Sequence, residues 1–328
     1  MNEKIANFAE QVVNDTLLTR EQIASLCAES GEDHDDLLYW SNRIRQKNFG
    51  NMIKVCSIVP GRLGGCNQDC KFCAQSVRYD TAVDKQAKVL SDEEILKAAA
   101  EAKDKGVPNF GIVYSGKAVT EAELVRLEGL IKTINQEYGL GVCASLGIIS
   151  AEQARRLAKA GLRRYNHNLE TSERHFKDIV TTHNYGDRIG TIKAAQSAGL
   201  GICSGGIFGI GESENDRIDM AIELSELGVD TVPMNFLHPI DGTPLGDVET
   251  LKPKEILRII GLYRFILPKV NLKVAGGRVL NLRDMQSWIF YAGCTSILSG
   301  NYLTTAGRAV EDDMQMLTDL GLEVAKCV

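Results

Sequence analysis

The chain has no long hydrophobic run, few aromatic residues and no excess of basic residues. No stretch of its 328 residues approaches the roughly 18 apolar residues that a membrane-spanning helix requires. Aromatic residues make up 6% of the chain, and 37 Lys and Arg face 43 Asp and Glu, which gives a net charge of −6. A mildly acidic chain lacks the electrostatic footprint of a nucleic-acid-binding protein. We therefore expect neither a membrane nor a nucleic acid as a partner.

The N-terminus also lacks a targeting segment. Charge begins within the first four residues, and neither an apolar core nor a small-residue cleavage site follows. We therefore expect a cytoplasmic protein. With 44% hydrophobic and 24% charged residues, the composition excludes disorder, collagen and coiled coil. The length fits two domains of about 150 residues or one (β/α)8 barrel of about 250 residues.

Cysteine, in contrast, is unusually frequent. In a reducing compartment cysteines seldom form disulfides, so nine of them point to metal binding or catalysis. Cys27 and Cys327 lie near the termini, and we expect no function for either. The nine are Cys27, Cys56, Cys66, Cys70, Cys73, Cys143, Cys203, Cys294 and Cys327.

From residue 50 onward, short apolar runs alternate with amphipathic helical stretches. Strands that alternate with single helices form right-handed βαβ units and a parallel sheet, and eight such units close a barrel. The predicted fold is therefore an α/β protein, a (β/α)8 TIM-type barrel over residues 46–328 with an N-terminal helical extension over residues 1–45. We expect this extension to be a lid over the bottom of the barrel or a dimer element. The predicted strands span residues 52–59, 109–114, 140–146, 163–169, 201–208, 230–237, 271–275 and 294–298.

Local signals mark the ends of the helices between these strands. Three pairs have the spacing of a capping box, in which two side chains close a helix N-terminus: Ser91 with Glu94, Thr120 with Glu123, and Ser150 with Gln153. Five glycines stand where helices should end in the left-handed conformation: Gly106, Gly139, Gly161, Gly199 and Gly228.

Three cysteines lie close together in the loop after the first strand. Cys66, Cys70 and Cys73 have the spacing Cys-x₃-Cys-x₂-Cys, and active sites of such barrels are built from loops at the carboxyl ends of the strands. Structural zinc almost always takes four protein ligands. Three thiolates instead leave one iron of a [4Fe-4S] cluster open to a substrate. The alternative is a zinc loop that a distant residue completes.

This loop on a parallel barrel resembles the radical S-adenosylmethionine enzymes, of which Cys-x₃-Cys-x₂-Cys is the signature. Three further segments are similar to the biotin synthase family within that superfamily. They are Tyr-Asn-His-Asn-Leu-Glu-Thr-Ser at 165–172, Cys-Ser-Gly-Gly-Ile-Phe-Gly-Ile-Gly-Glu at 203–212, and Asn235 with Gly-Thr-Pro-Leu at 242–245. The resemblance extends from residue 40 to residue 320.

The resemblance implies a particular chemistry. Cys66, Cys70 and Cys73 would hold a [4Fe-4S] cluster whose open iron binds S-adenosylmethionine. One electron would cleave that molecule to a 5′-deoxyadenosyl radical, which removes hydrogen from dethiobiotin so that sulfur can bridge two carbons and form biotin. The cofactor does the difficult step, and the protein orients it and excludes water and oxygen. We also expect a flavodoxin or ferredoxin-type electron donor, the iron–sulfur assembly machinery and a homodimer.

The same resemblance implies residues that bind the cofactor. Phe72 would pack on the adenine ring, and Glu170, where the family has Asp, would bind the ribose hydroxyls. Asn166 would make a further contact. Gly205 and Gly206 would let the backbone approach the cofactor closely, as glycine in a strand often does.

Substrate contacts are expected from other residues. Asn168 and Asn235 would pair with the ureido ring of the substrate, since an amide offers both a donor and an acceptor. Thr304 and Thr305, after the eighth strand, are candidates for the substrate carboxylate, with a helix cap as the alternative. Arg188 is a further candidate that could instead form a salt bridge on its helix.

An inner layer of the barrel carries a second group of cysteines. Cys56, Cys143 and Cys203 lie on the first, third and fifth strands, and Arg278 follows the seventh. Side chains from alternate strands share a layer of such a barrel. A buried Arg requires a partner, although each Cys alone could be a small buried side chain. In the family, three Cys and an unusual Arg hold an auxiliary iron–sulfur cluster that donates sulfur.

The chain departs from the family at one position of this group. Gly111 stands on the second strand where the family has a cysteine. We interpret Cys56, on the neighbouring first strand, as the replacement ligand. The auxiliary cluster is therefore expected to be a [2Fe-2S] form or a larger four-iron form. We expect Cys294 to pack in the core.

Two other functions fit part of the pattern. A related radical enzyme of the hydrogenase-maturation or methylornithine-synthase type would share the loop, but not the inner thiols with the paired asparagines. A non-catalytic iron–sulfur electron carrier or sensor would need neither an open iron nor a substrate pocket. Anaerobic cleavage of S-adenosylmethionine separates the enzymes from the carrier.

Overall fold

The computed structural model describes residues 1–326, so Cys327 lies outside the described residues. Its centre is a closed parallel barrel in which β10 pairs with β1 to complete the ring. All eight predicted strands are present near their expected places, and the (β/α)8 fold is confirmed. The strands of the ring are β1 (Met52–Leu63), β3 (Asn109–Tyr114), β4 (Gly141–Ser145), β5 (Arg164–Asn166), β6 (Gly201–Cys203) with β7 (Gly206–Phe208), β8 (Thr231–Phe236), β9 (Asn271–Val274) and β10 (Ser296–Leu298).

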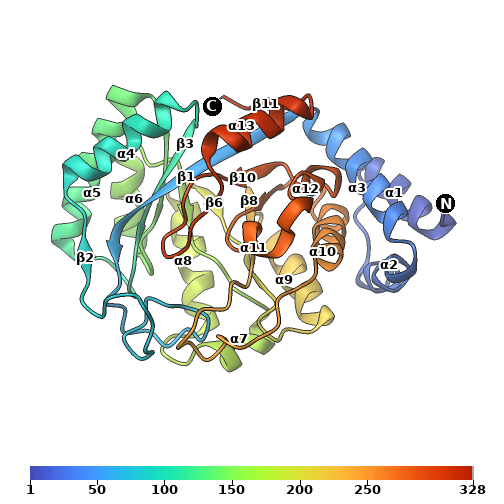
Figure 1. Cartoon of the computed structure of the whole chain (residues 1–328), viewed down its shortest axis with the longest axis horizontal. Helices are drawn as coiled ribbons and strands as arrows, with labels where there is room; N and C mark the ends of the chain where they lie inside the picture. The colour runs from blue at the N-terminus through green and yellow to red at the C-terminus, as the bar shows by residue number, and fades with distance from the viewer. Residues whose placement is uncertain (327–328) are drawn as a thin grey trace.

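Helices follow the strands and surround the ring (Figure 1). The three predicted capping boxes form, and the five predicted glycines all have positive φ. Each signal depends only on residues within a few positions of one another, so it does not depend on how the barrel packs around it. The helices are α4 (Asp92–Asp104), α5 (Glu121–Thr133) with a π-helical turn at Ile134–Tyr138, α6 (Ala151–Lys159), α7 (Glu173–Ile179), α8 (Tyr185–Ser197), α9 (Glu214–Glu226), α10 (Pro253–Ile266), α11 (Arg278–Leu282) with a 3₁₀ turn at Arg283–Met285, α12 (Trp288–Tyr291) and α13 (Val310–Asp319).

The predicted strand over residues 201–208 is two short strands. Ser204 and Gly205 leave the ladder between β6 and β7, and the backbone N–H of Glu170 donates to the Gly205 carbonyl across the gap. A Cβ atom on Gly205 would lie 2.0 Å from the carbonyl oxygen of Pro233. Only glycine permits this close approach of the two backbones, and the approach is what interrupts the strand.

The N-terminal extension consists of α1 (Glu3–Val13), α2 (Arg20–Glu32) and α3 (His34–Phe49). Helix α3 continues past residue 45 and packs against α10 and α12. Gly261 of α10 allows close contact, because a Cβ there would meet Leu37 and Ser41 at 3.0–3.1 Å. The extension therefore lies beside α10 on the flank of the barrel (Figure 1). The lid expected over the bottom of the barrel is not the arrangement found.

Two short strands were not predicted. Strand β2 (Lys88–Val89) pairs antiparallel with the end of β1, and β11 (Glu323–Val324) pairs with its beginning. Two residues are too few to give a periodic pattern. None of the described helices is long and apolar enough to cross a membrane.

A buried ion pair fixes α13 to the barrel. Both oxygens of Asp313 accept hydrogen bonds from Arg278, at 3.0 and 2.5 Å, and the Ser299 hydroxyl donates to the same carboxylate at 2.7 Å. All three residues are fully buried. Burial lowers the pKa of Arg278, but hydrogen bonds and charge from Asp313 raise it more, so the guanidinium stays charged. The C-terminal helix therefore depends on a charge pair with no access to water.

Asp313→Ala would leave the Arg278 guanidinium buried without its carboxylate. Removing one partner of a buried ion pair costs about 3–5 kcal/mol. We expect a correspondingly lower free energy of unfolding, measured by urea denaturation followed by circular dichroism. Asp312→Ala, at an exposed position of the same helix, is the matched control. Equal midpoints for the two variants would contradict this role.

Candidate active site

The three loop cysteines face a cavity of about 200 Å³ at the carboxyl ends of the strands. We call this cavity the loop pocket. Cys66, Cys70 and Cys73 line it together with five of the residues expected around them: Phe72, Asn166, Asn168, Glu170 and Arg188. Burial raises the pKa of the Cys73 thiol to about 11, and it raises the pKa of Cys70 as well. Without a bound metal, these two side chains are thiols at neutral pH.

Asp69, which lies between the first and second of these cysteines, fixes the loop. Its carboxylate accepts hydrogen bonds from the backbone N–H groups of Thr181 and Thr182, at 3.0 and 3.1 Å, and from both hydroxyls. Tyr79 donates to the Asp69 carbonyl at 2.6 Å. Burial opposes charge on Asp69, but these hydrogen bonds hold its pKa well below its usual range. Sequence analysis missed this residue because its partners lie 112 and 113 residues away.

Arg188 occupies the wall of the loop pocket. Its guanidinium donates to the Asn168 carbonyl at 2.7 Å and lies 3.5 Å from the Glu170 carboxylate. The second Nη faces His183 Nε2 at 2.9 Å, and the guanidinium stacks over Phe176. Burial, and then the charge of Arg188, lower the pKa of His183 to about 4, so its ring is neutral and can accept. Arg188 thus forms an ion pair, with Glu170 rather than with a residue of its own helix, and because it also lines the loop pocket its role toward a substrate stays a prediction.

Glu170 is held in an unusual backbone conformation. Its φ is +72°, in the left-handed region that non-glycine residues rarely adopt. Burial raises the pKa of its carboxyl, while Arg188 and Asn168 lower it. The backbone N–H of Ile207 donates to the Glu170 carbonyl, and Glu170 forms a parallel bridge with Gly206. Strain of this kind persists where surrounding structure fixes the residue, often at functional sites.

Gly205 and Gly206 do not line the loop pocket, contrary to the expectation that they approach a cofactor. A Cβ on Gly206 would lie 2.5 Å from the Glu170 carbonyl oxygen and from the sulfur of Met220. Together with the contact of Gly205 to Pro233, this shows that the close approach is to the protein's own backbone. The two glycines therefore position Glu170.

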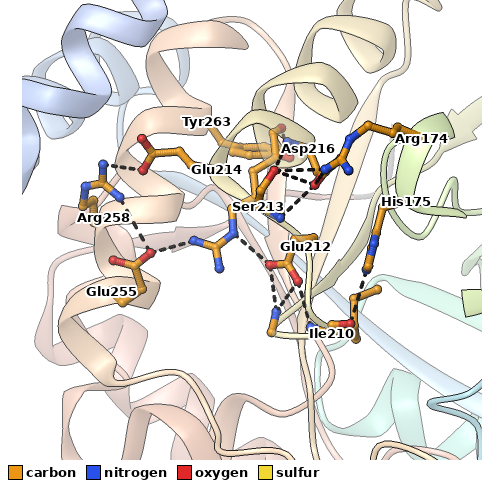
Figure 2. Close-up of polar contacts among 12 residues, drawn as sticks. Arg174, His175, Ile210, Glu212, Ser213, Glu214, Asp216, Glu255, Arg258 and Tyr263 are labelled. Atoms are coloured by element: carbon orange, nitrogen blue, oxygen red, sulfur yellow. Dashed lines mark hydrogen bonds and ion pairs between the residues drawn. The ribbon is translucent and has the colours of Figure 1, made fainter. Parts of the chain in front are cut away.

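Hydrogen bonds and ion pairs of charged side chains connect the segment after β7, at residues 209–213, to α9 and α10 (Figure 2). The Glu212 carboxylate accepts from the backbone N–H groups of Gly209 and Ile210 and pairs with Arg217 at 2.8 Å. Asp216 accepts from Ser172 at 2.6 Å, which ties α9 to the residues that follow Glu170. The network supports the edge of the loop pocket without lining it.

The inner cysteines face a second cavity, of about 270 Å³, which we call the inner pocket. Cys56, Cys143 and Cys203 line it from three different strands. Burial raises the pKa of Cys143 to about 12, and the neighbouring Cys56 contributes. Asn166 and Asn168 line both the inner pocket and the loop pocket. The two sets of thiols therefore lie on opposite sides of one pair of asparagines.

The cation of the inner pocket is Lys273, and the prediction that Arg278 joins this layer is wrong. Lys273 Nζ lies 3.4 Å from Cys203 Sγ, whereas Arg278 pairs with Asp313 and does not line the pocket. Lys273 lies within β9, where alternate side chains point into the barrel. Arg278 follows the strand, after the turn at Gly277 with φ +75°. The period-two alternation of side chains along β9 was the sequence signal that could have predicted the inward position of Lys273.

Arg164 of β5 is a second cation that sequence analysis missed. Burial lowers its pKa, but the nearby Cys143 and Cys56 thiolates raise it more. Its Nη1 donates at 3.1 Å to Asn109 Oδ1 of β3, which is separated from β5 by β4 alone. Burial likewise lowers the pKa of Lys273, and the facing Cys203, Cys56 and Cys143 thiolates raise it. Both cations favour ionised thiols.

Asn235 lies where the inner pocket meets a third cavity, of about 280 Å³, that contains Thr304 and Thr305. Asn235 Nδ2 donates to the Gly206 carbonyl at 3.1 Å, and its Oδ1 accepts from the backbone N–H of Gly276 at 2.9 Å. These bonds fix the orientation of the amide. Neither threonine caps a helix, because α13 begins after Ala309.

Cys294 is a core side chain, as expected. It is fully buried and its thiol donates to the Ser296 carbonyl at 2.9 Å. Among residues 1–326, no three His, Cys, Asp or Glu side chains form a site for a single metal ion. Both sets of three thiols nevertheless supply the soft sulfur ligands that iron–sulfur clusters take. The donor chemistry of the two pockets therefore fits such clusters.

Solved structures with the same fold include methylornithine synthase (PylB), with a TM-score of 0.84 and 20% identity over 97% of both chains. The hydrogenase maturase HydG also matches, with a TM-score of 0.84 and 16% identity over 99% of this chain and 76% of its own. At these identities the likeness establishes the fold alone.

Sequence comparisons are more specific. The Radical SAM superfamily model matches residues 62–224, and the Biotin and Thiamin Synthesis associated domain matches residues 233–323. Biotin synthase of Heliobacterium modesticaldum is 46% identical over 308 residues, which is 94% of each chain. Biotin synthase of Geotalea uraniireducens is 42% identical over 100% of this chain and 99% of its own. The chain therefore belongs to the biotin synthase family of the radical S-adenosylmethionine superfamily.

Proposed function

We propose that this protein converts dethiobiotin to biotin by radical insertion of sulfur. The observation that carries the proposal is the presence of two sets of three thiols in one barrel, on either side of Asn166 and Asn168. One set would serve radical generation and the other would serve sulfur donation. An electron carrier would need neither an open iron nor a substrate pocket between its centres.

Cys66, Cys70 and Cys73 would hold a [4Fe-4S] cluster in the loop pocket. When bound, this cluster and S-adenosylmethionine supply the 5′-deoxyadenosyl radical that removes hydrogen from the substrate. The protein's part is to orient and enclose the cofactor. Phe72 offers an aromatic face, and Glu170 offers a carboxylate that Arg188 and Asn168 keep in position.

The substrate would lie between the two sets of thiols. Asn235 and Asn168 have amide groups that backbone contacts hold in place, and each retains an N–H that can donate to the ureido oxygen. Thr304 and Thr305, in the adjoining cavity, would bind the carboxylate at the far end of the molecule. The resulting path from the thiols to the threonines suits an elongated substrate.

Cys56, Cys143 and Cys203 would hold the auxiliary cluster, with Lys273 beside them. Cys56 takes the place of the cysteine that the family carries where this chain has Gly111. The cluster would be a [2Fe-2S] form or a larger four-iron form. A flavodoxin or ferredoxin-type protein would supply the electron, the iron–sulfur assembly machinery would load the clusters, and the enzyme would act as a homodimer.

Cys70→Ala tests the loop cluster. Two thiolates cannot hold a cluster with one open iron, so cleavage of S-adenosylmethionine should be abolished. The measurement is 5′-deoxyadenosine formation under anaerobic conditions with a chemical reductant. Cys27→Ser, at a buried cysteine outside both pockets, is the control and should retain the activity. Near wild-type 5′-deoxyadenosine production by Cys70→Ala would refute the assignment.

Cys56→Ser tests the inner cluster separately. A serine oxygen is a poor replacement for the soft thiolate that iron–sulfur clusters require. We expect iron content to fall by the auxiliary share while 5′-deoxyadenosine still forms and biotin does not. Iron analysis with Mössbauer spectra distinguishes the two centres. If Cys56 were only a small buried side chain, serine would cost about 1–3 kcal/mol of stability, and both clusters and biotin formation would persist.

A further inference from the structure

Three cations from three strands line the amino-terminal side of the inner thiols. Lys54 of β1 lies two residues before Cys56 and on the same face of its strand, which places it about 6–7 Å nearer the amino end of the barrel. Arg164 of β5 shares a face with the pocket residue Asn166, and Lys273 lines the inner pocket itself. We call Lys54, Arg164 and Lys273 the cationic floor.

The cationic floor has an excess of positive charge. None of its three members forms an ion pair with a carboxylate in the part of the chain that the structure describes. The Asp230 carboxylate acts on Lys54 without pairing with it, and Asp230 Oδ2 accepts from the backbone N–H of Ile202 at 2.6 Å. Because Lys273 and Arg164 face the thiols, Lys54 is the member of the floor whose charge is left to attract a small anion.

A hydroxyl without a partner completes this surface. Ser296 of β10 is fully buried, and its Oγ has no hydrogen-bond partner. Its backbone pairs with Lys54 on one side and with Lys273 on the other. A free hydroxyl between two cations can donate a hydrogen bond to a small anion.

The members of the floor differ in what they contact. Lys273 meets Cys203 at 3.4 Å, and Arg164 acts on Cys143, so their charges are engaged by the thiols. Lys54 makes no hydrogen bond to a thiol and is partly exposed. It therefore lies between the inner thiols and the amino end of the barrel, whereas Asn168 and Asn235 lie on the carboxyl side.

We propose that Lys54, with Ser296, forms an entry site through which hydrosulfide reaches the inner thiols from the amino end of the barrel. The proposal rests on the proposed function, because sulfur that leaves with the product must be replaced. Bound substrate would occupy the carboxyl side of the inner thiols. A second route would therefore let the lost sulfur be replaced from the amino side. Entry is the binding of a small anion, and it requires no electron transfer.

Uptake of sulfide by the full-length apoprotein tests the proposal. Wild type, Lys54→Gln and Lys54→Arg are incubated anaerobically with a fixed mixture of ferrous and ferric iron and a range of sodium sulfide concentrations. Mössbauer spectra then report how far each centre has filled. Loss of one nearby charge should raise the sulfide concentration that half-fills the inner site roughly tenfold. Lys54→Arg should stay within about threefold of wild type, because it keeps the charge.

Two controls isolate the effect. Filling of the loop cluster in the same samples should not change, and Lys97→Gln, at an exposed position of α4, should behave as wild type. Added salt should reduce the difference between wild type and Lys54→Gln in the sulfide concentration that half-fills the inner site, because salt screens the charge of Lys54. Circular dichroism and an unchanged loop cluster establish that Lys54→Gln is folded.

Equal sulfide dependence of the inner site in wild type and Lys54→Gln would overturn the entry site. So would a shift in Lys54→Gln that Lys54→Arg fails to restore. Failure of the proposed function looks different: the wild-type enzyme, with both centres loaded, would form no biotin from dethiobiotin.

Discussion

The contact between Lys273 and the inner thiols is the constraint on which the rest of the site depends. Three thiols in the interior of a barrel resist ionisation, because burial disfavours the charged form. Lys273, at 3.4 Å from Cys203, and Arg164, beside Cys143, counter that resistance from two other strands. In return, the buried cations need the thiols. This mutual dependence explains charged side chains in a layer that most barrels fill with aliphatic residues.

The barrel places the two sets of thiols at different depths along its strands. Thiols in the loop after β1 lie at the carboxyl ends, and thiols within β1, β4 and β6 lie deeper. Asn166 and Asn168 stand between them and face both pockets. Radical generation and sulfur donation can thus act on one molecule from opposite sides.

The sequence predicted those features that depend on local pattern or on the strand order. Alternating runs gave the eight strands, and capping boxes gave the helix starts. The partners of Asp69, Thr181 and Thr182, could not be predicted, because these contacts span more than a hundred residues. Arg278 was misplaced because strand order alone does not say where a side chain points after a strand ends. The inward position of Lys273, within β9, could have been predicted from the period-two alternation of that strand, but that signal was not used. Gly205 and Gly206 were assigned to a cofactor because a sequence does not reveal which backbone comes close.

The most direct test of the two-centre account is X-ray diffraction at the iron absorption edge from anaerobically reconstituted crystals. The account predicts two iron peaks, one enclosed by Cys66, Cys70 and Cys73, and the other by Cys56, Cys143 and Cys203 beside Lys273. A single iron peak at the loop, with the inner thiols free in protein that forms biotin, would contradict it.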